Sequence, residues 1–174
     1  MLAMDFPTPL VLVDVDGVLN PSRPSSTEYR RHWVFPGGLV HRLSLNPGHG
    51  AMLTDLARET GAELVWGSYW RNRANTWIGP RIGLPPLRFV PIPTPRPSRW
   101  TTPGRWKAEQ VAAWIGQVPF VWLEDDPSIP GHLAGQRGLG QHLVVTVDPG
   151  VGLTHDHVER ARTWLKAVQS QPRP

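Results

Sequence analysis

Short apolar runs, rich in β-branched and aromatic residues, alternate along this chain with segments of helical spacing. The runs occupy residues 9–14, 62–67, 88–92, 119–123 and 142–147. The segments of helical spacing occupy residues 47–61, 103–115 and 154–168. Strands that alternate with helices predict an α/β fold: a three-layer sandwich with a central, mostly parallel sheet and helices on both faces.

The chain length predicts a single domain spanning residues 1–174, because 174 residues can bury one core and the sequence shows no repeat. Residues 31–35 and 39–45 are β-type segments on either side of Pro36-Gly37-Gly38. They predict a small β-hairpin within an insertion at about residues 21–46.

Several classes of protein are excluded by what the sequence lacks. It contains no cysteine, so disulfides, thiolate zinc sites and cysteine catalysis are ruled out. No apolar run approaches the length that crosses a bilayer, and the first nine residues lack the basic start of a signal peptide. We therefore expect a cytoplasmic protein that does not associate with membranes.

The first candidate site follows the first apolar run, where the sequence reads Asp14-Val15-Asp16-Gly17. Ligands of open parallel sheets bind beyond the carboxyl ends of the strands. Two carboxylates two residues apart can point to the same side, and Gly17 allows the backbone to turn sharply. Such oxygen ligands suit Mg²⁺, although a solvated turn at a strand end is an equally good reading of this motif alone.

Three further signals follow in chain order. Ser68 ends the second run and offers a hydroxyl, although it could simply cap the next helix. Lys107 is one of only two lysines beside sixteen arginines, and it shares a helix face with apolar residues. Its ammonium could reach toward the site, or it could simply extend into solvent. Three acids, Glu124-Asp125-Asp126, end the fourth run, where they repel one another unless a cation compensates them.

Taken together, these four signals resemble the motifs of the haloacid dehalogenase-like hydrolase superfamily over roughly residues 10–148. The wordings Val-Trp-Gly-Ser-Tyr-Trp and Val-Trp-Leu-Glu-Asp-Asp look like a small bacterial branch of that superfamily. The resemblance implies that Asp14 is the nucleophile and that Asp16 is the general acid and base. It also implies that Ser68 and Lys107 hold the transferring phosphoryl group.

The same resemblance implies a Mg²⁺ site and a surrounding substrate site. The metal ligands are expected to be Asp14, Asp16, Asp125 and Glu124. The substrate-binding residues are expected to be Gly67, Ser68, Arg71 and Lys107. The acidic pair is either Glu124-Asp125 or Asp125-Asp126, and Asp125 belongs to both. Too few residues separate the motifs for a full cap domain, so the hairpin is expected to be a partial flap.

One basic segment suggests a partner. Residues 64–108 contain no acidic residue, and their arginines are interleaved with tryptophans. Arginine and aromatic side chains together suit single-stranded nucleic acid, whose phosphates bind guanidinium groups and whose bases stack on rings. The alternative is that the tryptophans pack in the core while the arginines are solvated.

The expected function is Mg²⁺-dependent hydrolysis of a phosphate monoester through an aspartyl-phosphate intermediate. Asp16 favours phosphate esters over haloacids, because dehalogenases of this superfamily lack the second aspartate. One alternative is a nucleotidase or a polynucleotide end phosphatase. Another, of a different class, is a catalytically weak module that binds nucleic acid or protein.

Overall fold

The computed structural model describes residues 7–24, 26–95 and 101–170. Its centre is a five-stranded sheet of order β5-β4-β1-β6-β7, in which every neighbouring pair is parallel. The strands are β1 (Leu10–Val13), β4 (Glu63–Trp66), β5 (Arg88–Phe89), β6 (Phe120–Glu124) and β7 (His142–Thr146). The first strand is fully buried and lies between two others, as its unbroken apolar sequence predicts.

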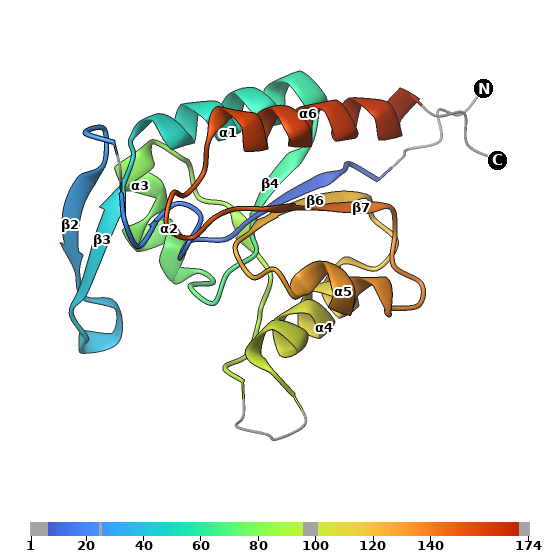
Figure 1. The fold of residues 1–174 in the computed structure, drawn as a ribbon, viewed down its shortest axis with the longest axis horizontal. Helices are drawn as coiled ribbons and strands as arrows, with labels where there is room; N and C mark the ends of the chain where they lie inside the picture. The colour runs from blue at the N-terminus through green and yellow to red at the C-terminus, as the bar shows by residue number, and fades with distance from the viewer. Residues whose placement is uncertain (1–6, 25, 96–100, 171–174) are drawn as a thin grey trace.

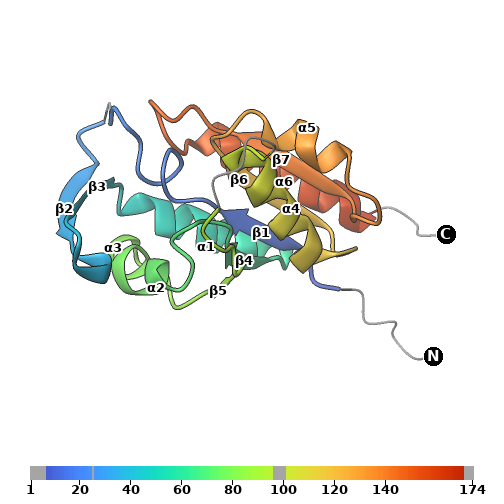
Figure 2. The same cartoon turned by 90° about the horizontal axis from the view of Figure 1, so that it is seen from below.

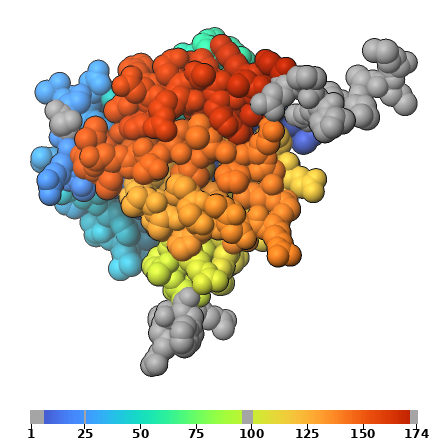
Figure 3. Space-filling model, turned by 45° about the vertical axis from the view of Figure 1, so that its right-hand side comes forward, coloured from blue at the N-terminus to red at the C-terminus, as the bar shows by residue number. Residues whose placement is uncertain are grey.

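Helices cover both faces of this sheet, which confirms the predicted α/β sandwich (Figure 1). One face carries α1 (Gly48–Thr60) and α6 (His155–Ser170), and the other carries α4 (Pro103–Ile115) and α5 (Ile129–Ala134). Alternate residues of β1 enter the two cores: Val11 and Val13 pack on the α1 side, Leu10 and Leu12 on the α4 side. In Figure 3, α6 and the β7–α5 region form one continuous outer face.

The predicted hairpin is present as β2 (Arg30–Val34) and β3 (His41–Leu45), paired antiparallel and joined through the short 3-10 turn Pro36–Gly38. It stands apart from the main sheet at one end of the molecule (Figures 1 and 2). Val34, Leu43 and Leu45 bury one of its faces in the α1-side core. The hairpin therefore has an inner face that packs on the core and an outer face, made of Arg31, Trp33, Arg42 and Ser44, that does not.

Three local predictions differ from the structure. The sequence predicts a short helix over residues 69–77, but helix α2 covers only Arg73–Trp77, because Arg71 takes a positive φ of 50° and ends any earlier helical turn. Strand β5 stops at Phe89, close to Pro91, which has no N–H for a ladder. The sequence predicts a Gly/Pro loop after the acids that follow residues 119–123, but residues 129–134 form α5, since Ile129 and Leu133 share a buried side.

A short helix, α3 (Gly79–Ile82), follows α2 and packs with it near α1. Among the helices of the described ranges, none combines the length and the apolar character needed to span a membrane.

Candidate active site

A cavity of about 1060 Å³ opens where the carboxyl ends of β1, β4 and β6 meet the hairpin. Of the residues singled out in the sequence, it is lined by Asp14, Asp16, Ser68, Lys107, Glu124, Asp125 and Asp126. Four separate segments of the chain therefore converge on one site, because the carboxyl ends of parallel strands lie at one edge of a sheet.

Lys107 is the charged centre of this site. Its side chain comes from the first turns of α4 and is only 5% exposed. The ammonium Nζ lies 2.6 Å from Asp14 Oδ2 and 2.7 Å from Glu124 Oε2, so it bridges the ends of β1 and β6. It also lies over the rings of Tyr69 and Trp122, at 5.6 and 5.5 Å from their centroids. An ammonium has three donors, and two are used here.

Burial and the neighbouring charges perturb the titration of these groups. Burial by itself lowers the pKa of Lys107, but the charges of Asp14 and Glu124 outweigh it, so the pKa is raised above its ordinary value. Burial, and then the charge of Asp14, raise the pKa of Glu124 well above its ordinary value, while Lys107 opposes this rise. Lys107 therefore remains charged at neutral pH and stabilises two buried carboxylates.

Asp16 is held by two donors. Its Oδ2 accepts a hydrogen bond from Trp70 Nε1 at 2.8 Å, and its Oδ1 accepts one from Asn20 Nδ2 at 3.0 Å. Asn20 Oδ1 in turn accepts from the backbone N–H of Ser44 at 2.8 Å. The Asp16 carboxylate is thus fixed beside Asp14 and linked through Asn20 to the hairpin.

The three acids after β6 have different surroundings. Glu124 Oε1 accepts from the backbone N–H groups of Asp125 and Asp126, and its other oxygen is taken by Lys107. Asp126 Oδ1 accepts from the N–H and the hydroxyl of Ser128, the residue directly before α5. Neither Asp125 nor Asp126 has an ion-pair partner among the described residues, but Asp126 is already hydrogen-bonded to Ser128, so Asp125 is the more available to a ligand.

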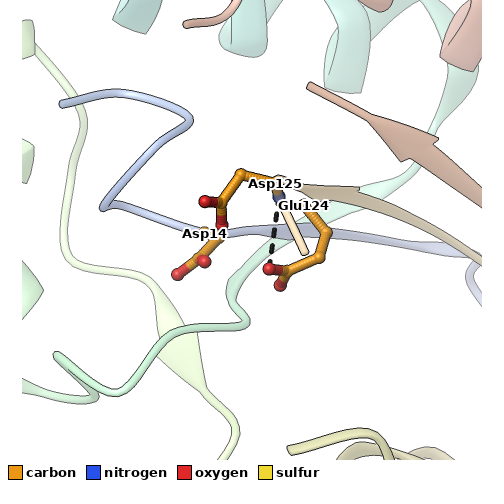
Figure 4. Close-up of side chains that lie close together, drawn as sticks. All are labelled: Asp14, Glu124 and Asp125. Carbon is orange, nitrogen blue, oxygen red and sulfur yellow. Dashed lines mark hydrogen bonds between the residues drawn. The ribbon is translucent and has the colours of Figure 1, made fainter. Parts of the chain in front are cut away.

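Asp14, Glu124 and Asp125 form a cluster that could hold a metal ion, with one oxygen of each lying within 4.8 Å of the others (Figure 4). Burial and the charge of Asp14 raise the pKa of Asp125, because no side-chain cation balances it fully. Gly17 makes room for this carboxylate: its φ is +77°, and a Cβ there would lie 2.3 Å from Asp125 Oδ2. The donor set of hard oxygens fits Mg²⁺.

The balance of charge around the cavity also fits a cation. Five carboxylates and three cationic side chains line it, the cations being Arg31, Arg42 and Lys107. An anionic phosphate would meet a net negative wall unless a divalent ion compensated it.

Ser68 lies at the end of β4 and is 1% exposed. Its Oγ accepts a weak hydrogen bond from the N–H of Trp70 at 3.3 Å, which leaves the hydroxyl proton available to the cavity. Gly67 and Arg71 do not line the cavity. Gly67 instead allows close packing, since a Cβ there would lie 3.0 Å from both Leu12 Cβ and Trp122 Nε1. Their proposed substrate contacts stay predictions.

Much of the basic segment 64–108 is used for local packing. Trp66 and Trp70 are buried, and Trp106 Nε1 donates to the carbonyl of Pro93. Arg88 pairs with Glu63, and Arg105 with Glu109. None of its described arginines lines the cavity, while Arg96, Arg99 and Trp100 lie outside the described residues.

The sequence analysis missed the hairpin's contribution, namely Arg31, Arg42 and Ser44. It also missed Asn20 and Trp70 as partners of Asp16. One signal was available: residues 29–54 contain three arginines and no acidic residue. The alternation of Arg31 and Trp33 along one strand places both on the same face.

A parallel sheet with Asp14 and Asp16 after its central strand, and a lysine bridging to acids on the next strand, defines a member of the haloacid dehalogenase-like hydrolase superfamily. More narrowly, the chain belongs to the family described as the HAD domain in Swiss Army Knife RNA repair proteins, whose family model matches residues 10–158. A search of curated proteins and a search of solved structures found no match.

Proposed function

We propose that this protein is a Mg²⁺-dependent phosphatase that removes a terminal phosphate monoester from RNA through an aspartyl-phosphate at Asp14. The observation that carries the proposal is the buried contact of Lys107 Nζ with Asp14 Oδ2 at 2.6 Å, beside an acidic cluster with an unpaired Asp125. This contact fixes the orientation of the Asp14 carboxyl group, as a nucleophile requires.

In the first step, a carboxylate oxygen of Asp14 attacks phosphorus, and the bond from phosphorus to the leaving oxygen breaks. Asp16 gives its proton to that leaving oxygen. In the second step, Asp16 takes a proton from water as the water oxygen attacks the same phosphorus. The bond to Asp14 then breaks, which releases inorganic phosphate and restores both carboxyl groups.

The transferring phosphoryl group is held by neutral and cationic donors in this proposal. Ser68 offers its hydroxyl proton, and Lys107 has one N–H beyond the two that reach Asp14 and Glu124. Asp14 and Asp125 would hold Mg²⁺, with Glu124 fixed behind them by Lys107 and the backbone. When bound, Mg²⁺ neutralises charge so that an anionic carboxylate and an anionic phosphate can approach each other.

Two observations favour RNA as the substrate. The matching family is described by its occurrence in RNA repair proteins. The cavity of about 1060 Å³ is slightly larger than ligand sites usually are, so it has room for far more than a phosphate group.

The test is hydrolysis of three substrates with and without Mg²⁺: an aryl phosphate, a mononucleotide and a phosphate-terminated oligoribonucleotide. We expect Mg²⁺-dependent release of phosphate, with the oligoribonucleotide preferred, and no activity in Asp14→Asn. Activity that persists in Asp14→Asn would overturn the proposal. A preference for the mononucleotide would mean that the substrate is a free nucleotide and not the end of an RNA.

A matched pair of variants tests which acids bind the metal. Asp125→Asn should raise the Mg²⁺ concentration needed for half-maximal activity. Asp126→Asn should leave it nearly unchanged, because an Asn oxygen can still accept the hydrogen bonds of Ser128 that Asp126 accepts. If Asp126→Asn raises that Mg²⁺ concentration as much as Asp125→Asn does, the metal belongs to the Asp125-Asp126 pair instead.

A further inference from the structure

The outer face of the hairpin has the composition of a binding surface. Residues directly opposite each other in an antiparallel pair share a face, and here Arg31 is opposite Ser44 while Trp33 is opposite Arg42. Arg31, Arg42 and Ser44 line the same cavity as Asp14. This face therefore extends the candidate active site outward.

Both guanidinium groups on this face are available. Across the described ranges, neither Arg31 nor Arg42 forms an ion pair, whereas Arg88, Arg105 and Arg162 each do. The two residues occupy diagonal positions of the hairpin, which typically lie about 7–8 Å apart. Two long arginine side chains at that spacing can bind one phosphodiester together or two successive ones.

Trp33 adds an aromatic plane to the same face. Its side chain is 63% exposed, which is unusual for a residue whose burial is so favourable. An exposed tryptophan beside free arginines suits a single strand, since every base can stack on a ring whatever its identity.

The hairpin is also held at a fixed position relative to the reacting group. The backbone N–H of Ser44 donates to Asn20, and Asn20 donates to Asp16. The ring of His41 packs edge-on against Trp70, the other donor to Asp16, with centroids 5.6 Å apart. The spacing between Asp16 and the arginine face is thus set by packed contacts rather than by a free loop.

We propose that the hairpin face of Arg31, Trp33, Arg42 and Ser44 binds the nucleotides next to the terminal phosphate of a single-stranded polynucleotide. Arg31 and Arg42 contact the adjoining phosphodiesters, and Trp33 stacks on a neighbouring base. This inference rests on the proposed phosphatase function and moves nucleic-acid recognition from residues 64–108 to the hairpin.

The test compares kcat/KM for a phosphate-terminated oligoribonucleotide with kcat/KM for an aryl phosphate in three variants. Arg31→Gln and Arg42→Gln should each lower the oligonucleotide value about tenfold or more, the usual effect of a lost charged hydrogen bond. Trp33→Ala should lower it about fivefold or more, through lost stacking. The aryl phosphate value should fall much less than the oligonucleotide value in all three variants, because that substrate has no adjoining phosphodiester or base for the hairpin face to contact.

Arg30→Gln is the matched control. Arg30 lies on the same strand, is exposed and does not line the cavity, because it belongs to the opposite face. It should leave both kcat/KM values unchanged. Each cavity arginine removed should also reduce the slope of log(kcat/KM) against log(salt) by about 0.7, whereas Arg30→Gln should not.

The outcomes separate this inference from the function on which it rests. If the wild-type protein hydrolyses the aryl phosphate but the three hairpin variants keep full oligonucleotide activity, the hairpin proposal is wrong and the phosphatase proposal stands. A loss that is equal for both substrates would likewise overturn it, as would a loss in Arg30→Gln of the same size. If no substrate is hydrolysed, the phosphatase proposal fails. The hairpin proposal then predicts that Arg31→Gln and Arg42→Gln weaken the binding of a labelled oligonucleotide, measured by fluorescence anisotropy, and unweakened binding would overturn it.

Discussion

Replacing Lys107 by methionine should destabilise the fold strongly while keeping most of the side chain's apolar contacts. Lys107 is 5% exposed and lies 2.6 and 2.7 Å from two buried carboxylates. Removing one member of a buried ion pair leaves an uncompensated charge, which typically costs about 3–5 kcal/mol. We expect a loss of that size in the free energy of unfolding, measured by urea denaturation at pH 8 with a chelator present.

The loss should depend on pH in a defined direction. Burial and Asp14 already raise the pKa of Glu124, and Lys107 opposes this. Without Lys107 the folded protein should therefore hold a proton on Glu124 that the unfolded chain releases above about pH 4.5. Because the unfolded state then binds fewer protons, stability falls as pH rises, so Lys107→Met should be closer to wild type at pH 5 than at pH 8.

Two further variants control this prediction. Adding Glu124→Gln to Lys107→Met removes both the cation and one of its carboxylate partners. The double variant should regain at least about 1 kcal/mol of the lost free energy of unfolding, since neighbouring charges couple. Arg105→Met, on the same helix, breaks only the exposed pair with Glu109 and should cost less than about 1 kcal/mol. If Lys107→Met costs no more than Arg105→Met, the account of the buried ion pair is refuted.

Three other substitutions test separate parts of the site and fold. Gly17→Ala should lower the free energy of unfolding, measured by denaturant titration, by about 1–2 kcal/mol, because φ at this position is +77°. It should also weaken Mg²⁺ binding, measured by calorimetry, because the new Cβ meets Asp125. Wild-type Mg²⁺ affinity in this variant would contradict the prediction. Trp70→Phe removes the donor to Asp16 and should lower kcat while unfolding changes by only about 1 kcal/mol, so an unchanged kcat would exclude a positioning role. Burial lowers the pKa of His49 to about 4, so below about pH 6.5 the folded state binds fewer protons than the unfolded chain. The free energy of unfolding should therefore fall as pH drops from about 6.5 to 4, by at most about 3 kcal/mol. His49→Gln should flatten that part of the stability profile, and an unaltered profile would show that other groups cause it.

The sequence predicted the sheet and the acidic and lysine part of the site because both follow from local patterns. Asp14, Ser68 and Glu124 each lie at or just after the end of an apolar strand, and parallel strands bring such ends together without knowledge of distant packing. Lys107 was singled out by the rarity of lysine and by its place on an amphipathic helix.

The hairpin's role could not be predicted in the same way. Its own pairing follows from local turn residues, but its placement against the sheet depends on tertiary contacts, such as Ser44 with Asn20 and His41 with Trp70. In the segment 64–108, composition alone does not show which side chains pack locally, whereas the structure pairs Arg88 with Glu63 and Arg105 with Glu109. Nucleic-acid binding by this segment stays a prediction.

The central claim is that Asp14 carries the phosphoryl group during turnover. The most direct measurement is reduction with borohydride during steady-state hydrolysis with Mg²⁺, followed by peptide mass spectrometry, because hydride converts an aspartyl-phosphate into homoserine. The account predicts homoserine at position 14, dependent on substrate and on Mg²⁺, with Asp16 unmodified. Homoserine at another aspartate, or none during sustained turnover, would contradict it.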